Sequence, residues 1–152
     1  MDSGNVIYLL KKDSPQAIRM IPIAGLSFPA YGTGIGKALL IGHERKALKA
    51  VSAGASGADG KHTILTFDAL EKQLRECRSD DIAHEYEKSN PHLRCVGAVL
   101  RKDSRIVAAL SIAVPIFLCD DRRIALRELL LQSKRRLEDL FREVDLDFAS
   151  RR

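Results

Sequence analysis

Two long β-type runs, residues 94–100 and 106–114, flank the tripeptide Lys102-Asp103-Ser104, which is typical of a hairpin turn. Four shorter runs of β-forming residues lie at 6–10, 18–23, 62–66 and 82–87. About six strands are therefore expected. Hairpins join them more often than strand–helix–strand units do. The pattern predicts an α+β domain, in which an antiparallel sheet is flanked by helices.

Helices are expected between these strands and after the last of them. Apolar residues at helical spacing predict a helix over 67–77, and a second helix begins near Thr33, which is a candidate N-cap. A short helix is expected over 43–51. A long amphipathic helix is expected over 121–144, with Asp120 or Asp121 as its cap.

Length and charge limit the class of protein. The 152 residues fit one domain, 1–152, and the net charge of +5 is spread thinly, so the chain does not resemble a self-contained DNA-binding domain. The longest apolar run, 106–118, is too short and interrupted to span a bilayer, so no membrane partner is expected. No signal peptide is recognisable, and three widely spaced cysteines favour a cytoplasmic location.

The segment Gly32–Lys37 is rich in glycine but does not fit the common nucleotide-binding loops. Tyr31 stands where a P-loop needs its first glycine, and Ala38 stands where it needs a hydroxyl. Lys37 likewise replaces the third glycine of a dinucleotide fingerprint. The free N–H groups of a helix start remain, and they suit a small anion such as a carboxylate. A plain tight turn explains the segment equally well.

One face of the predicted hairpin carries only small side chains. A turn centred on Asp103 would pair Cys95 with Ser111 and Gly97 with Ala109, and Ala113 would share their face. Such a face favours close packing of a helix backbone, and a ligand cavity is the alternative.

The other chemistry-bearing residues form weaker patterns. His43, His62, His84 and His92 show no metal-ligand spacing, and neither a metal nor another cofactor is predicted. Glu85 and Glu87 alternate along an extended segment, which is typical of a solvated strand. Cys95 and His92 could form a nucleophile–base pair, but no oxyanion donor is identifiable, so no catalytic residue is assigned.

Two segments resemble signatures of the isocitrate lyase regulator (IclR) family of bacterial transcription factors. The first is Pro29–Leu40, and the second is Leu93–Val99 followed by residues 107–112. Their order and separation also match, and the resemblance extends from Val6 to about Phe141. It covers the C-terminal effector-binding domain of such a regulator, without the N-terminal winged helix-turn-helix. It implies a GAF-like fold with a six-stranded antiparallel sheet.

The resemblance also implies an effector site. The backbone N–H groups of Gly34 and Ile35 would hold a ligand carboxylate. The other implied contacts are polar ones from Glu85, Cys95 and Ser111 and apolar ones from Met20 and Leu93. Ala113 stands where some members have a second serine, which makes the site more apolar and favours a ligand other than glyoxylate or pyruvate. The bulk of Ile35 would narrow the entrance.

The expected function is therefore non-enzymatic sensing of a small organic acid. Effector binding would control operator DNA binding through the winged helix-turn-helix that this chain lacks. A homodimer or homotetramer is expected. Two alternatives remain: a pure oligomerisation module with a vestigial pocket, and an enzyme that acts on a small acid through Cys95.

Overall fold

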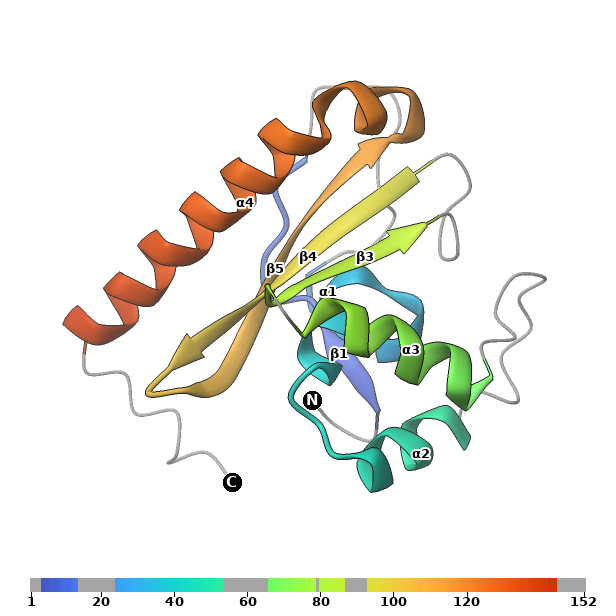
Figure 1. Ribbon diagram of the computed structural model, residues 1–152. Coiled ribbons are helices and arrows are strands. Elements are labelled where there is room, and N and C mark those ends of the chain that lie inside the picture. The colour runs from blue at the N-terminus through green and yellow to red at the C-terminus, as the bar shows by residue number, and fades with distance from the viewer. Residues whose placement is uncertain (1–3, 14–23, 54–65, 79, 87–92, 145–152) are drawn as a thin grey trace.

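The computed structural model describes residues 4–13, 24–53, 66–78, 80–86 and 93–144 (Figure 1). Five strands form two antiparallel sheets in these residues. The strands are β1 (Asn5–Ile7), β2 (Ser27–Pro29), β3 (Ile82–Tyr86), β4 (Leu93–Lys102) and β5 (Arg105–Pro115). β1 pairs with β2, while the second sheet has the order β3-β4-β5. The α+β class is confirmed, whereas the six-stranded sheet and the GAF-like label stay predictions.

The β4–β5 hairpin forms where it was expected, but with a different register. Asp103 and Ser104 have φ values of 49° and 66° and form a two-residue turn. A register shift between Leu100 and Arg101 then displaces the pairing. As a result Gly97 lies opposite Ser111, so the predicted pairing of Gly97 with Ala109 was wrong.

The displaced register pairs Cys95 with Ala113, so the predicted pairing of Cys95 with Ser111 was also wrong. The displacement is an even number of residues, and a strand returns to the same face every second residue. The prediction that small side chains share one face is therefore confirmed.

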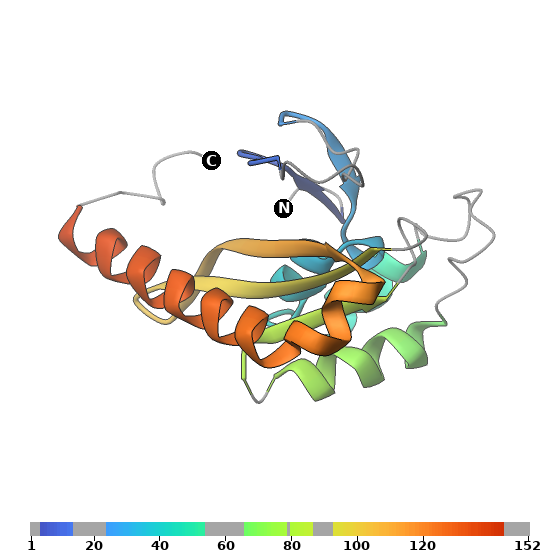
Figure 2. The same ribbon diagram turned by 90° about the horizontal axis from the view of Figure 1, so that it is seen from above.

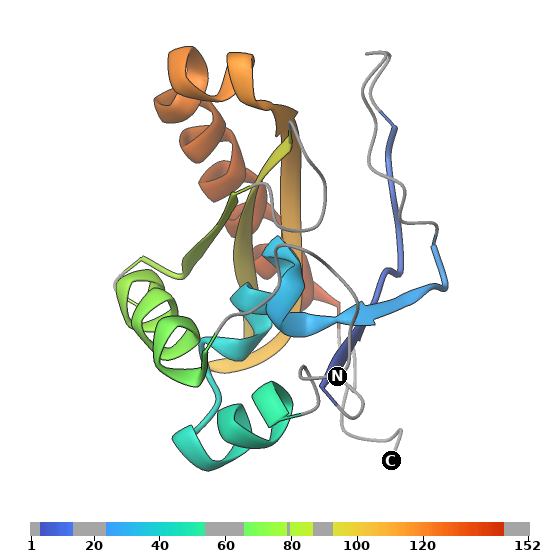
Figure 3. The ribbon, with the colours of Figure 1, turned by 90° about the vertical axis from the view of Figure 1, so that its right-hand side faces the viewer.

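Helices cover both faces of the three-stranded sheet. α1 (Gly34–Leu40) packs against all three strands, and α2 (Arg45–Ala53) and α3 (Phe67–Cys77) lie beyond it. α4 (Ile116–Glu143) covers the other face, where Leu130 packs with Val96 and Ala98. Figure 2 shows α4 running along the sheet. In Figure 3 the sheet separates α4 from the β1–β2 ribbon.

Local sequence signals placed most helices correctly. The Thr33 hydroxyl oxygen accepts a hydrogen bond from the Gly36 N–H at 3.0 Å, which confirms Thr33 as an N-cap. A short 3₁₀ helix, η1 (Ala30–Gly32), precedes it. The helix over 67–77 is present with those bounds, and Thr66 caps it.

The start of α4 differs from the prediction. The helix begins at Ile116, and extended Pro115 is its N-cap residue, so Asp120 and Asp121 lie within the helix and not at its N-cap position. Proline suits this position because the N–H it lacks would have no partner inside the helix. The strands expected over 18–23 and 62–66 lie outside the described residues except for Thr66, which is the N-cap residue of α3. None of the described helices is long and apolar enough to cross a membrane.

Candidate functional site

The start of α1 lies directly on the small face of the hairpin. An ideal Cβ added to Gly97 would lie 2.6 Å from the Gly34 carbonyl oxygen and 3.3 Å from the Ile35 nitrogen. A Cβ added to Gly34 would lie 3.0 Å from the Cβ of Cys95. The absence of side chains at Gly34 and Gly97 therefore brings the two backbones together, as the helix-packing interpretation predicts.

Two N–H groups at the start of α1 have no hydrogen-bond partner among the described residues. The Thr33 N–H donates to the Ala30 carbonyl, and the Gly36 N–H donates to the Thr33 hydroxyl. The N–H groups of Gly34 and Ile35 lie between these two donors and face no acceptor in the described part of the chain. Both residues are buried, and a buried N–H without an acceptor is costly.

The β5 half of the small face borders a cavity of about 1380 Å³. Its walls come from the segment Val6–Asp13, from α1 and from β5, and Figure 3 shows the first of these running alongside β5. Ile35, Ser111 and Ala113 line this cavity. The helix-packing interpretation therefore holds at β4, while a cavity borders β5, and its use for a ligand stays a prediction.

The ionisable side chains that line the cavity are mostly basic. They are Lys11, Lys12, His43, Arg101 and Arg105, with Asp13 as the acidic one. Lys11 forms an ion pair with Asp13 at 2.7 Å, and Arg101 pairs with Asp81. The excess of positive charge favours an anionic occupant.

The predicted site residues divide into four groups. Ile35, Ser111 and Ala113 line the cavity. Gly34, Leu93 and Cys95 are buried and do not line it, and Cys95 is 3% exposed. Glu85 is placed by its backbone alone, opposite Cys95 in the β3–β4 ladder. Met20 lies outside the described residues, as do His92 and Glu87.

Sequence reasoning missed the wall formed by the N-terminal segment. Tyr8, Leu9 and Leu10 line the cavity opposite β5, although they read as an ordinary strand in the sequence. Leu39 lies one helical turn after Ile35 and also lines the cavity. The i, i+4 spacing of the two residues places them on the same face of a helix, so the sequence could have predicted Leu39 as a lining residue.

A second group of titratable side chains lies away from the cavity. Lys37 of α1 is 1% exposed, and its positive charge acts on Cys77 of α3 and His84 of β3. Burial raises the pKa of the Cys77 thiol and lowers the pKa of the His84 imidazole. None of the three lines the cavity. The described residues contain no group of side chains arranged to hold a metal ion.

Residues 1–139 match the family described as Bacterial transcriptional regulator IclR C-terminal. The chain belongs to this family. The chain is 29% identical over 126 residues to the HTH-type transcriptional regulator KdgR of Escherichia coli (strain K12). That match covers 82% of this chain and 48% of KdgR, so the chain spans about half the length of this IclR-family relative.

Solved structures of IclR-family proteins share the fold. The repressor BlcR of Agrobacterium tumefaciens superposes with a TM-score of 0.80 and 22% identity over 91% of this chain and 56% of BlcR. An IclR homologue of Microbacterium hydrocarbonoxydans complexed with 4-hydroxybenzoate superposes with a TM-score of 0.75 and 16% identity, over 88% of this chain and 56% of that protein. The chain thus has the sequence family and the fold of the C-terminal domain of IclR-family transcription regulators.

Proposed function

We propose that this chain senses a small carboxylate, held between the start of α1 and β5. The observation that carries the proposal is the pair of N–H groups at Gly34 and Ile35 that find no acceptor in the described part of the chain, because Ile35 also lines the cavity. Such N–H groups bind a carboxylate well at a helix start. Ser111 lines the same cavity and would add a hydroxyl contact to the ligand.

The cavity lining supports an acidic ligand with apolar parts. Its basic side chains outnumber its acidic ones, and its α1 wall is apolar at Ile35 and Leu39. The crystallised Microbacterium relative binds 4-hydroxybenzoate, which combines a carboxylate with an aromatic ring. Alanine at 113 removes a hydroxyl that some family members have, which favours a more apolar acid than pyruvate. Glu85 and Met20 are proposed as further contacts of the ligand, whereas Cys95 and Leu93, which are buried and do not line the cavity, are proposed to support the site from behind.

The domain would act on DNA through a separate winged helix-turn-helix, as expected of an IclR-family regulator. Effector binding would shift the population of subunit arrangements, and this shift would change the grip on an operator. We propose that the domain assembles as a homodimer or homotetramer in the cytoplasm.

The two alternatives have less support. An enzyme would need a nucleophile that its substrate can reach, and Cys95 is 3% exposed and does not line the cavity. A pure oligomerisation module would not need the two unpartnered N–H groups beside the cavity. We therefore favour sensing over both.

A thermal-shift screen tests the proposal. The chain is heated with 4-hydroxybenzoate, keto acids, sugar acids and other small carboxylates, each well above its expected dissociation constant. A ligand at one hundred times that constant adds about 2.7 kcal/mol and raises the melting temperature by roughly 5 °C. Ser111→Ala should raise the dissociation constant of that ligand about tenfold, because one hydrogen bond is lost.

Ser133→Ala is the matched control, since Ser133 is half-buried on α4 and does not line the cavity. It should leave the affinity unchanged. Equal weakening by both variants would contradict the proposed site. Silence across all the acids would contradict the carboxylate class and favour the oligomerisation module.

A further inference from the structure

The register of β5 depends on one extra residue. Leu100 lies opposite Ala108, while the next residue of β4, Arg101, lies opposite Ile106. Val107 is therefore the additional residue of a β-bulge on β5. Strand pairing on the turn side of this bulge differs by one position from the pairing beyond it.

This bulge decides which face of β5 borders the cavity. A two-residue turn at Asp103-Ser104 without a bulge would place Leu110 opposite Gly97. A slip of one residue turns every side chain of a strand to the other face of the sheet. Ser111 would then point toward α4, and the cavity would lose its hydroxyl group.

Beside the bulge, the backbone of β4 extends past the end of its other neighbour, β3. β3 begins at Ile82, opposite Ala98, and the Val99 N–H still donates to the Asp81 carbonyl at 3.2 Å. Backbone groups at every second residue of a strand point to the same side, so the groups of Arg101 also face this edge. Among the described residues, no strand lies opposite Arg101 at this edge.

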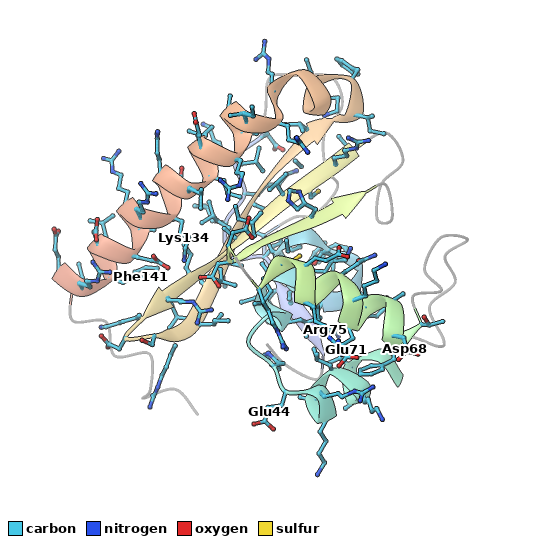
Figure 4. All side chains as sticks on the ribbon, in the orientation of Figure 1. Glu44, Asp68, Glu71, Arg75, Lys134 and Phe141 are labelled. Atoms are coloured by element: carbon cyan, nitrogen blue, oxygen red, sulfur yellow. The ribbon has the colours of Figure 1, made fainter. Side chains whose placement is uncertain are left out.

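Two residues of α4 bind that edge instead of a strand. The Lys134 ammonium donates to the Val99 carbonyl at 2.9 Å, and the Arg101 N–H donates to Glu138 Oε1 at 2.8 Å. Figure 4 shows Lys134 extending from α4 toward the hairpin. Lys134 and Glu138 also pair with each other one helical turn apart.

The hydrogen bonds that Lys134 and Glu138 form with β4 are largely shielded from water. The side chains of Lys134 and Glu138 are only 12% and 14% exposed, so water competes weakly for their hydrogen bonds. Arg101 adds a side-chain contact, since its guanidinium donates to both carboxylate oxygens of Asp81 at 2.8 and 3.0 Å. The residue bound through both its backbone and its side chain is therefore the one opposite the bulge.

We propose that Lys134 and Glu138 are positioning residues, which hold the bulged register and so keep Ser111 on the cavity face. They act on the site through the backbone of β4 and not by touching a ligand. The importance of Ser111 rests on the proposed function, whereas the control of register by α4 does not.

Cross-strand disulfides report the register directly and need no ligand. Val99 and Ala109 lie opposite each other, and a non-hydrogen-bonded pair of this kind has a Cα separation of about 4.5 Å, which a disulfide can bridge. The double variant Val99→Cys/Ala109→Cys reports the bulged register, and Val99→Cys/Ala108→Cys reports the register without a bulge. Peptide mapping by mass spectrometry separates these disulfides from any formed by native cysteines.

With α4 unchanged, we expect the 99–109 disulfide to form in higher yield in its double variant than the 99–108 disulfide does in the other. Adding Glu138→Ala should lower its yield by half or more and raise the yield of the 99–108 disulfide. Glu138→Gln should keep the original yields, because its amide oxygen still accepts the Arg101 N–H. Asp139→Ala should also keep them, since the Asp139 side chain pairs with Arg142 on the exposed face of α4.

Unchanged yields in Glu138→Ala would overturn the proposal, even if that variant is less stable, because lower stability alone does not select a register. If Glu138→Ala does not fold, amide hydrogen exchange on the unchanged chain decides. The Arg101 amide should then be protected at least as strongly as the Val99 amide, and rapid exchange at Arg101 would overturn the proposal. A chain that binds no acid but passes these tests would refute the proposed function alone.

Discussion

Gly97 of β4 lies against Gly34 of α1 so closely that a Cβ at position 97 would be 2.6 Å from the Gly34 carbonyl oxygen and 2.9 Å from its carbonyl carbon. Backbone atoms cannot rotate away as a side chain can, so a methyl group there must displace α1 from the sheet. The contact also brings the unpartnered N–H of Ile35 beside the strand that carries the small face.

Gly97→Ala should therefore destabilise the domain by about 1–3 kcal/mol, which is the usual cost of overpacking a close contact. The free energy of unfolding from urea denaturation measures this effect. Gly32→Ala is the control, because a Cβ at Gly32 meets nothing within 4 Å and should change stability by no more than about 0.5 kcal/mol. Equal effects of the two variants would show that the close approach is not tight in solution.

The small face was predictable from the sequence because alternate residues of a strand lie on the same face, whatever the exact pairing with the next strand. The register was not, since the bulge at Val107 depends on contacts with α4 that no local pattern reveals. The helix start at Thr33 was predictable from its side chain, which bonds three residues away. Asp120 and Asp121 misplaced the start of α4 because they look like caps, whereas Pro115 ends the strand.

The candidate site was predictable on the same terms. Ile35 and Ser111 lie within the two family signatures, Ala113 directly follows the second, and all three line the cavity. The opposite wall, including Tyr8 and Leu10, comes from a distant part of the chain. Its position depends on tertiary packing, which periodicity cannot supply.

On α4, Leu130 should contribute far more to the stability of the domain than its neighbour Leu129. Leu130 is 0% exposed and packs with Ile82, Val96 and Ala98, whereas Leu129 is 53% exposed. Leu130→Ala should cost about 2–5 kcal/mol, the range for removing a buried leucine, and Leu129→Ala less than about 1 kcal/mol. Chemical denaturation of both variants gives the comparison. Similar losses would contradict the packing of α4 on this face of the sheet.

Asp81 should make the domain sensitive to strong acid. The Arg101 guanidinium hydrogen-bonded to Asp81 lowers the pKa of that carboxyl below its ordinary value. The stabilisation is present above the unfolded carboxyl pKa of about 3.9 and is lost as the pH falls through the lower folded value. Asp81→Asn should therefore flatten the fall in stability below about pH 4.

Asparagine is a suitable replacement because Asp81 has a φ of 61°, a left-handed conformation that asparagine tolerates. Unfolding free energies measured through this acidic range in both proteins make the comparison. An equally steep fall in Asp81→Asn would mean that other carboxyl groups carry the acid sensitivity.

His84 should act in a separate, milder window of pH. Burial lowers the pKa of its imidazole, and the charges of Arg123, Arg127 and Lys37 add to that effect, while Asp80 opposes it. The unfolded chain therefore takes up a proton near pH 6.5 before the folded chain does. The contribution to stability is present above that value and is lost as the pH falls through the folded pKa.

His84→Gln removes this titration without introducing a charge. Between about pH 7 and pH 5 the stability of the unchanged chain should fall, and that of His84→Gln should fall less. The window lies above the one governed by Asp81, so the two variants can be told apart in one set of denaturation curves. Parallel curves for His84→Gln and the unchanged chain would mean that the imidazole is as easily protonated in the fold as in the unfolded chain, and that α4, which covers this face of β3, leaves it open to water.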